Sequence, residues 1–293
     1  MVTTDYYQAE YGAGEDDVQT ALQVGKILGD SPSGEPHRDL LKMLFGLLDL
    51  TSLNTDDNDE TARRLSRLLN EFPSHFPGVP QVAAVCVYPT LVEEIRRTLT
   101  TSAVRLASVG TGFPSSQTFL SVKLAECELL MKKGADEIDV VIPVGRLVAG
   151  QTGQVMNELL LVREITKNAT LKVILETGLL KSARAIRLAS LIAMEAGADF
   201  IKTSTGKTAV SATPEAAYTM ARAIRDFQRR SGRKVGIKAA GGIAEIRDAL
   251  VYHALVNAIL GDEWMNPGLF RIGASRLANN LLTGIAGHAV SYF

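Results

Sequence analysis

Eight short apolar runs recur along the chain, and a longer stretch with helical periodicity follows each of them. Most of the runs are rich in β-branched residues, and they cover residues 47–50, 82–88, 105–109, 138–142, 172–176, 199–202, 235–238 and 270–273. This alternation is typical of βα units on a parallel sheet, and eight units in roughly 250 residues predict a (β/α)8 (TIM) barrel. A doubly wound open sheet is the alternative, but no Gly-x-Gly-x-x-Gly follows the first run.

We expect residues 39–293 to form one barrel domain and residues 1–38 to form an acidic extension on its outside. The extension has one amphipathic patch, at 18–28, which predicts a single helix. Within the barrel domain, residues 117–133 and 182–195 have helical periodicity. Thr213, Pro214 and Glu215 supply an N-cap, a first helical residue and an acidic first turn, so another helix should begin there.

Composition narrows the classes of function. The net charge is −1, with 22% charged and 46% hydrophobic residues, which fits a soluble globular protein and no nucleic-acid or membrane partner. The two cysteines, Cys86 and Cys127, have no metal-type spacing, and the acidic start does not look like a targeting segment. We therefore expect a cytoplasmic protein with small-molecule substrates. A homodimer is the first oligomer to consider.

Active sites of such barrels lie at the carboxyl ends of the strands. Each candidate there could be structural alone, but so many charged groups at one barrel mouth are hard to explain structurally. The candidates in or just after the apolar runs are Asp49, Thr51, Cys86, Asp139, Lys172, Glu176, Lys202, Lys238 and Ser275.

Lys202 and Lys238 occupy matching positions near the ends of neighbouring strands. Lys202 should enter a mostly apolar interior. Two ammonium groups about 4 Å apart repel by about 4 kcal/mol at an effective dielectric of about 20. That is close to the roughly 4.6 kcal/mol needed to make a lysine half neutral at pH 7. The pair would thus activate an amine nucleophile. The alternative is that Lys238 pairs with Asp139 or Glu176 while Lys202 faces solvent.

Asp139 is flanked by strand residues, where an ionised carboxylate needs a partner. Aimed at the two lysines it would be partnered, and it could move protons through a water molecule. An ion pair without catalysis is the alternative.

Loops rich in small residues follow three of the predicted strands. Gly241 and Gly242 follow the seventh strand, Ser275 follows the eighth, and Gly206 and Lys207 follow the sixth. Such loops let backbone N–H groups approach a phosphate, and barrels commonly bind one after strands seven and eight. Ordinary barrel turns also use glycine. A phosphorylated substrate is therefore the favoured interpretation.

The positions of the histidines argue against a zinc-dependent aldolase or hydrolase. The four of them, His37, His75, His253 and His288, lie neither at predicted strand ends nor at ligand spacing. We therefore expect no zinc site. A serine or cysteine hydrolase is also disfavoured. Imine formation between a lysine amine and a phosphorylated carbonyl compound remains.

The motifs along residues 45–280 resemble those of the 2-deoxyribose-5-phosphate aldolase family, which are class I (Schiff-base) enzymes. The matching segments are 48–53 (LDLTSL), 85–89 (VCVYP), 134–141 (GADEIDVV), 171–177 (LKVILET), 200–207 (FIKTSTGK), 236–242 (GIKAAGG) and 270–275 (FRIGAS). The resemblance implies a (β/α)8 barrel without metal or cofactor. It also implies reversible cleavage of 2-deoxy-D-ribose 5-phosphate to D-glyceraldehyde 3-phosphate and acetaldehyde, in deoxyribonucleotide catabolism.

The same resemblance implies roles for individual residues. Lys202 matches the Schiff-base lysine, Lys238 the lysine that depresses its pKa, and Asp139 the proton relay. The positions that match phosphate-binding residues are Gly206, Lys207, Gly241, Gly242 and Ser275, and those that match pocket-lining residues are Asp49, Thr51, Cys86 and Lys172.

Three features depart from the family pattern. Ser115-Ser116 replaces a glycine-containing loop, and Arg276 replaces a small residue beside the phosphate loop. Many members end in a tyrosine thought to assist proton transfer, and Tyr292, one residue before the end of this chain, is the candidate for that task. Two alternatives stay open: another Schiff-base sugar-phosphate aldolase, or a barrel retained as a non-catalytic binding or scaffold protein.

Overall fold

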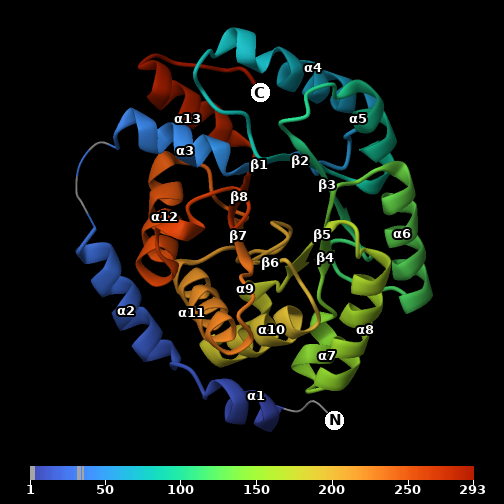
Figure 1. Ribbon diagram of the computed structural model, residues 1–293, viewed down its shortest axis with the longest axis vertical. Coiled ribbons are helices and arrows are strands. Elements are labelled where there is room, and N and C mark those ends of the chain that lie inside the picture. Colours follow the sequence, from blue (N-terminus) through green and yellow to red (C-terminus); the bar gives the residue numbers. More distant parts are fainter. Residues whose placement is uncertain (1–3, 32–33, 35) are drawn as a thin grey trace.

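The computed structural model describes residues 4–31, 34 and 36–293 (Figure 1). Eight parallel strands close into a barrel in chain order, which confirms the predicted (β/α)8 fold. The strands are β1 (Leu48–Thr51), β2 (Ala84–Val87), β3 (Arg105–Gly110), β4 (Glu137–Val141), β5 (Thr170–Ile174), β6 (Phe200–Lys202), β7 (Gly236–Ala240) and β8 (Phe270–Ala274). Each lies within two residues of a predicted run at both ends.

Helices surround the barrel (Figure 1). They are α3 (Arg38–Gly46), α4 (Asp59–His75), α5 (Val92–Thr98), α6 (Leu120–Lys133), α7 (Val144–Val148), α8 (Thr152–Ile165), α9 (Thr177–Leu180), α10 (Ala183–Glu195), α11 (Pro214–Ser231), α12 (Ile246–Leu260) and α13 (Arg276–Ala286), with 3-10 turns η1 (Pro89–Leu91) and η2 (Asp262–Trp264). The predicted start of α11 is confirmed, because the Thr213 hydroxyl caps the helix by accepting from the Ala216 N–H. No helix in the described part of the chain is long and apolar enough to cross a membrane.

The N-terminal extension holds two helices, α1 (Thr4–Tyr11) and α2 (Asp17–Gly29), where the sequence predicted one. Helix α2 covers the predicted amphipathic patch, and it packs against α11 and α12. The expectation of a single helix was wrong because α1 depends on tertiary contacts more than on its own periodicity. Its Tyr7 is buried, and the Tyr11 hydroxyl donates to Glu195 of α10. Residues 1–3, 32, 33 and 35 of the predicted extension lie outside the described residues.

The strand register decides which side chains meet inside the barrel. Lys202 of β6 is the register partner of Lys238 of β7, and Asp139 of β4 is the partner of Lys172 of β5. Since side chains alternate across a strand, these partners project to the same side of the sheet. Their full burial places them in the barrel interior.

Candidate active site

Seven charged side chains form one ionic network inside the barrel. It joins the cations Lys172, Lys202, Lys238 and Arg271 to the carboxylates Asp49, Glu137 and Asp139. None of the seven is more than 5% exposed. A buried charge is tolerated when it is paired and hydrogen-bonded. In this network each charged side chain has at least one partner of opposite charge.

Lys202 is the least neutralised lysine of this network. Its Nζ contacts one carboxylate, donating to Asp139 Oδ2 at 2.8 Å. Burial lowers the pKa of Lys202, and repulsion from Lys238 adds to this, although attraction to Asp139 acts in the opposite direction. The amine of Lys202 therefore gives up its proton more readily than an ordinary lysine does.

Lys238 and Lys172 lie in the opposite electrostatic situation. Lys238 Nζ is 2.5 Å from Asp49 Oδ2 and 2.8 Å from Asp139 Oδ2, the same oxygen that Lys202 contacts. Burial opposes the charge on Lys238, but the two carboxylates outweigh it and raise its pKa. For Lys172, three carboxylates likewise overcome burial and raise the pKa. Both lysines thus stay cationic beside Lys202.

Charge counting across the network leads to the same result for Lys202. Four cationic groups face three carboxylates if every group is ionised. A neutral Lys202 amine removes the surplus positive charge and balances the interior. Because an uncompensated charge in a buried site is costly, the network itself favours the neutral amine.

Asp139 is placed to handle protons. Burial would raise the pKa of its carboxyl group, but Lys172, Lys202 and Lys238 hold it far below its usual range. Its Oδ2 atom accepts from both Lys202 and Lys238. Its Oδ1 atom lies 3.0 Å from Lys172 Nζ but accepts no well-directed hydrogen bond from the described residues. That oxygen retains accepting capacity next to the Lys202 amine.

A cavity of about 210 Å3 opens directly above Lys202. Lys202 and Thr51 line it, together with the loops after β6, β7 and β8, including Gly206, Lys207, Gly241, Gly242, Ser275 and Arg276. The structure therefore brings the five predicted phosphate-binding residues to one cavity with Lys202. Their roles in binding stay predictions.

The loops after β6 and β7 approach each other closely at Gly241. This glycine has a φ of +89°, and a Cβ atom there would lie 2.6 Å from Ser211 Cβ and 3.1 Å from Gly206 Cα. Only glycine fits this position without displacing the facing loop. On the other side of the cavity, Ser275 is the N-cap residue of α13 but makes no capping hydrogen bond. The N–H groups of the first turn of α13 thus lie beside the cavity without a side-chain cap from Ser275.

The remaining predicted pocket residues lie below or beside the cavity. Thr51 donates its hydroxyl to the Asp49 carbonyl. Asp49 is fully buried, and Lys172, Lys238 and Arg271 outweigh burial to hold its pKa well below the usual range. Cys86 lies in a small apolar cluster with Leu53, Ala84, Ala107 and Val109, and burial raises the pKa of its thiol. Asp49 and Lys172 therefore belong to the network beneath the cavity, whereas Cys86 belongs to an apolar cluster that reaches the cavity through Leu53.

Tyr292 lies away from this cavity. Its hydroxyl donates to the Leu68 carbonyl of α4 at 2.7 Å, and its ring packs edge-on against Phe72 and Phe76. The chain end is fixed between α4 and α13, because Asn279 of α13 accepts from the backbone N–H of Tyr292 (Figure 1). In this arrangement, the predicted proton shuttle does not reach the Lys202 amine.

Two network residues were missed as candidates, and one candidate lies elsewhere. Arg271 and Glu137 form a bidentate pair at 2.9 and 3.2 Å, below Lys172. The sequence signal that could have identified them is a charged residue within a predicted strand. Glu176 does not join the lysines: it has a φ of +55° and accepts from the Thr205 hydroxyl at 2.5 Å. The proposed pairing of Lys238 with Asp139 is present, whereas Lys202 is buried and does not face solvent.

A closed parallel barrel with buried lysines at its strand ends can host many kinds of enzyme chemistry, and similarity to known proteins defines the class. The model of the DeoC/LacD family aldolases matches residues 45–280. The chain is 44% identical over 257 residues to the deoxyribose-phosphate aldolase of Bos taurus and 42% identical over 257 residues to that of Homo sapiens. Each alignment covers 84% of this chain and 80% of the relative. The chain therefore belongs to the DeoC/LacD family of aldolases.

Solved structures agree on the fold. The deoxyribose phosphate aldolase from Aeropyrum pernix, described as having a unique tetrameric structure, superposes with a TM-score of 0.64 and 24% sequence identity. The match covers 92% of this chain and 98% of that one. The shared (β/α)8 barrel thus extends over nearly the full length of both chains.

Proposed function

We propose that this aldolase reversibly cleaves 2-deoxy-D-ribose 5-phosphate to D-glyceraldehyde 3-phosphate and acetaldehyde through a Schiff base on Lys202. The observation that carries the proposal is the Lys202 amine, which has a lowered pKa and lines a cavity rimmed by three glycine- and serine-containing loops. The names of the Bos taurus and Homo sapiens relatives support the substrate. The catalytic unit is the barrel of residues 39–293, and residues 1–38 are the extension.

The phosphate of the substrate binds between the loops after β6, β7 and β8. The backbone of Gly206, Gly241 and Gly242 approaches it without side chains in the way, and Ser275 and Lys207 add a hydroxyl and a positive charge. Exposed Arg276 supplies a further cation at the rim. Binding at this end fixes the distance from the phosphate to the carbonyl carbon, which is held over Lys202.

The first covalent step is attack of the neutral Lys202 amine on the aldehyde carbon of the open-chain sugar. A C–N bond forms, the carbonyl oxygen takes up a proton, and loss of water from the carbinolamine leaves an iminium ion on Lys202. Lys238 favours this step because its positive charge disfavours the protonated amine. Asp139 accepts the amine proton and returns it to the departing water through a bridging water molecule.

Carbon–carbon cleavage follows from the iminium ion. The hydroxyl group two carbons from the iminium carbon loses its proton, its C–O bond becomes a carbonyl, and the adjacent C–C bond breaks with its electron pair passing to the iminium. The products are glyceraldehyde 3-phosphate and an enamine on Lys202. Protonation of the enamine carbon and hydrolysis of the resulting imine release acetaldehyde. We assign these proton transfers to Asp139 with bridging water, because the Tyr292 hydroxyl is bound to α4.

Asp49, Thr51, Lys172 and Cys86 act by shaping the surroundings of the reacting amine. Asp49 and Lys172 hold Asp139 and Lys238 in place through the buried ion pairs. Thr51 lines the cavity, and Cys86 belongs to the apolar cluster whose Leu53 lines it. The two-carbon aldehyde fragment fits against this apolar lining because it carries no charge.

Assembly into a homodimer is a separate proposal. Helix α6 and the residue before it present Phe119, Val122 and Leu129 on one helical face, and these side chains are 80%, 51% and 57% exposed. An interface between copies of this chain would cover them. Light scattering of the intact protein and of Phe119→Ser tests this, and a monomeric protein in both cases removes the proposal.

Borohydride trapping tests the proposed function. Reduction in the presence of acetaldehyde or 2-deoxyribose 5-phosphate, followed by peptide mass mapping, should give one adduct, on the peptide that holds Lys202. The matched control is Lys207→Ala, which removes an exposed lysine of the same cavity and should leave the acetaldehyde adduct in place. An adduct on Lys238 or Lys172, or no adduct in folded protein, would contradict the assignment.

A further inference from the structure

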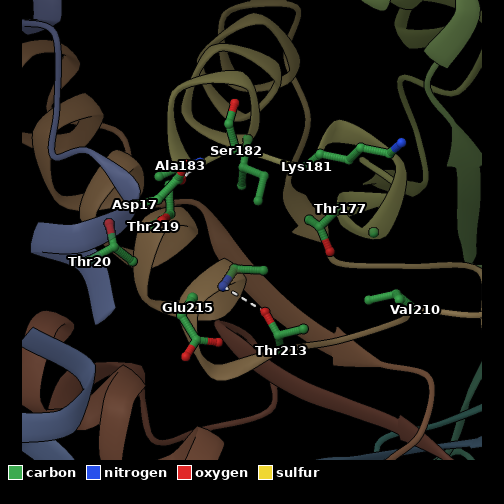
Figure 2. A pocket seen from close by; sticks show the side chains of 13 residues that line it. Asp17, Thr20, Thr177, Lys181, Ser182, Ala183, Val210, Thr213, Glu215 and Thr219 are labelled. Atoms are coloured by element: carbon green, nitrogen blue, oxygen red, sulfur yellow. Dashed lines mark hydrogen bonds between the residues drawn. The ribbon is translucent and has the colours of Figure 1, made fainter. Parts of the chain in front are cut away.

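A second cavity, of about 220 Å3, lies at the barrel rim between the N-terminal extension and the barrel helices (Figure 2). Helix α2 contributes Asp17 and Thr20, helix α9 contributes Thr177, and helix α11 contributes Glu215 and Thr219. None of these residues lines the cavity above Lys202. The extension therefore completes a pocket that the proposed aldolase reaction does not use.

Three threonine hydroxyls in this pocket lack hydrogen-bond partners among the described residues. Thr20, Thr177 and Thr219 are 2%, 3% and 6% exposed, and the hydroxyl oxygen of each is buried and unpaired. Figure 2 shows Thr20 and Thr177 on opposite sides of the pocket, with Thr219 near Asp17. A buried hydroxyl without a partner is costly, on the order of 1–3 kcal/mol. Three in one cavity indicate a site built to hydrogen-bond a ligand.

The charges around the pocket are already compensated. The Asp17 carboxylate accepts from the Ala183 N–H at 2.6 Å, so it occupies the N-terminus of α10. Glu215 lies in the first turn of α11, whose N-terminus Thr213 caps. An anionic ligand would meet both carboxylates, whereas a cationic ligand would meet two helix N-termini and Lys181. The electrostatics thus favour an uncharged ligand.

The size and walls of the pocket limit the ligand further. Since a water molecule occupies about 30 Å3, the cavity has room for about seven or eight non-hydrogen atoms. Ile186, Val210 and Ala216 provide apolar surface between the hydroxyl groups. A short carbon chain that bears several hydroxyl groups matches this mixture of polar and apolar surface.

We propose that this pocket, which we call the rim pocket, binds a small uncharged polyol or sugar of three or four carbons. The hydroxyls of Thr20, Thr177 and Thr219 bond to the ligand hydroxyls, and the Asp17 and Glu215 carboxylates accept from others. The rim pocket is separate from the catalytic cavity, but the loop after β6 borders both. Val210 of this loop lines the rim pocket, whereas Gly206 and Lys207 line the cavity above Lys202.

Titration of the full-length protein with erythritol tests the proposal. Erythritol has four hydroxyl groups but neither a carbonyl nor a phosphate, so it cannot form the imine proposed for Lys202. Saturation-transfer NMR should show saturable binding, and Thr20→Val and Thr219→Val should each raise Kd by about 2- to 10-fold. Valine replaces the hydroxyl with a methyl group and leaves nothing unpaired, so both variants should fold.

Thr166→Val is the matched control. Thr166 is also buried, but its hydroxyl already donates to the Val162 carbonyl and lies outside the rim pocket, so erythritol affinity should not change. Inorganic phosphate should not compete with erythritol. Absence of saturable binding, an affinity of both pocket variants equal to that of the unmodified protein, or competition by phosphate would each overturn the proposal. The borohydride result is independent of all three outcomes.

Discussion

The two sides of the barrel interior differ in chemistry. Strand β1 and strands β4 to β8 supply the seven charged side chains of the ionic network. Strands β2 and β3 supply Ala84, Cys86, Ala107 and Val109, which are small and fully buried. On this second side, Phe113 and Tyr88 pack against the cluster.

This difference explains how a buried lysine can become a neutral amine. Within the charged side, contact with Asp139 raises the pKa of Lys202, whereas repulsion from Lys238 lowers it. Burial has the larger effect and lowers the pKa, and the apolar side helps to keep water away from the amine. A reactive amine thus depends on both sides, and the predictions below separate their contributions.

Removal of Lys202 should have the largest effect on activity and little effect on stability. Lys202→Met deletes the proposed nucleophile, so kcat should fall by at least about 10³-fold. It also leaves three cationic groups facing three carboxylates, so the thermal midpoint should stay close to that of the unmodified protein. Steady-state kinetics and calorimetry on the same sample check both. A variant that keeps most of its activity would remove Lys202 from the mechanism.

In contrast to Lys202→Met, Lys172→Met should cause a large loss of stability. Three carboxylates contact Lys172, and because the Lys202 amine is neutral, removal of Lys172 leaves them facing only Lys238 and Arg271 as cations. Breaking such a network costs about 3–5 kcal/mol, measurable by urea denaturation. Lys202→Met is the matched control, since it removes the same side chain from the same network. Equal stability of the two variants would mean that charge balance does not govern the interior.

Replacement of Lys238 should change the pH dependence of the reaction. The Lys202 amine is reactive when unprotonated, so kcat/KM should rise with pH through the lowered pKa of Lys202. Lys238→Leu removes a nearby cation, which raises that pKa and should move the rising limb to higher pH. The profile is measured on folded variant protein. If the rising limb of the pH profile does not move in this variant, the lowered pKa of Lys202 is due to burial alone.

A substitution on the apolar side should have the smallest effect. Cys86→Ser places a hydroxyl group in the apolar cluster and should cost about 1–2 kcal/mol of stability. Cys86→Ala keeps the cluster apolar and serves as the control. We expect kcat/KM to fall only a few-fold in the serine variant, with its rising limb displaced slightly to higher pH. A loss as large as that of Lys202→Met would show that Cys86 itself contributes to the chemistry.

The barrel and the lysine pair could be predicted because both are local properties of the sequence. Each strand was visible as an apolar run between helical stretches, and matching strand ends placed Lys202 beside Lys238. The full ionic network could not be predicted in this way. Arg271 meets Asp49 and Glu137 across 222 and 134 residues of chain, and such pairings depend on barrel closure. The interior is accordingly less apolar than the sequence indicated.

Local backbone conformation and distant contacts explain the other differences between the sequence-based predictions and the structure. Lys202 is the last residue of β6, whereas Glu176 lies beyond Ile174, the last residue of β5, and its positive φ turns the side chain toward Thr205. Tyr292 lies near the chain end, where the sequence carries no signal for its position. Its ring packs among Phe72, Phe76 and Phe293. Helix α1 was missed for a related reason, because its contacts with α10 come from distant residues.

The Glu137–Arg271 pair at the base of the network has a consequence for how such sequences diverge. A mutation that neutralises one partner unbalances the buried charge, because Glu137 then keeps only Lys172 and Arg271 keeps only Asp49. Replacement of both by apolar residues of similar volume removes one charge of each sign and keeps the balance. Substitutions at these two positions should therefore occur together during evolution. In an alignment of relatives, positions 137 and 271 should covary. The apolar side carries no such constraint. An engineer who wishes to change the aldehyde accepted by this barrel can vary the apolar side one residue at a time, but has to redesign the ionic side as a unit.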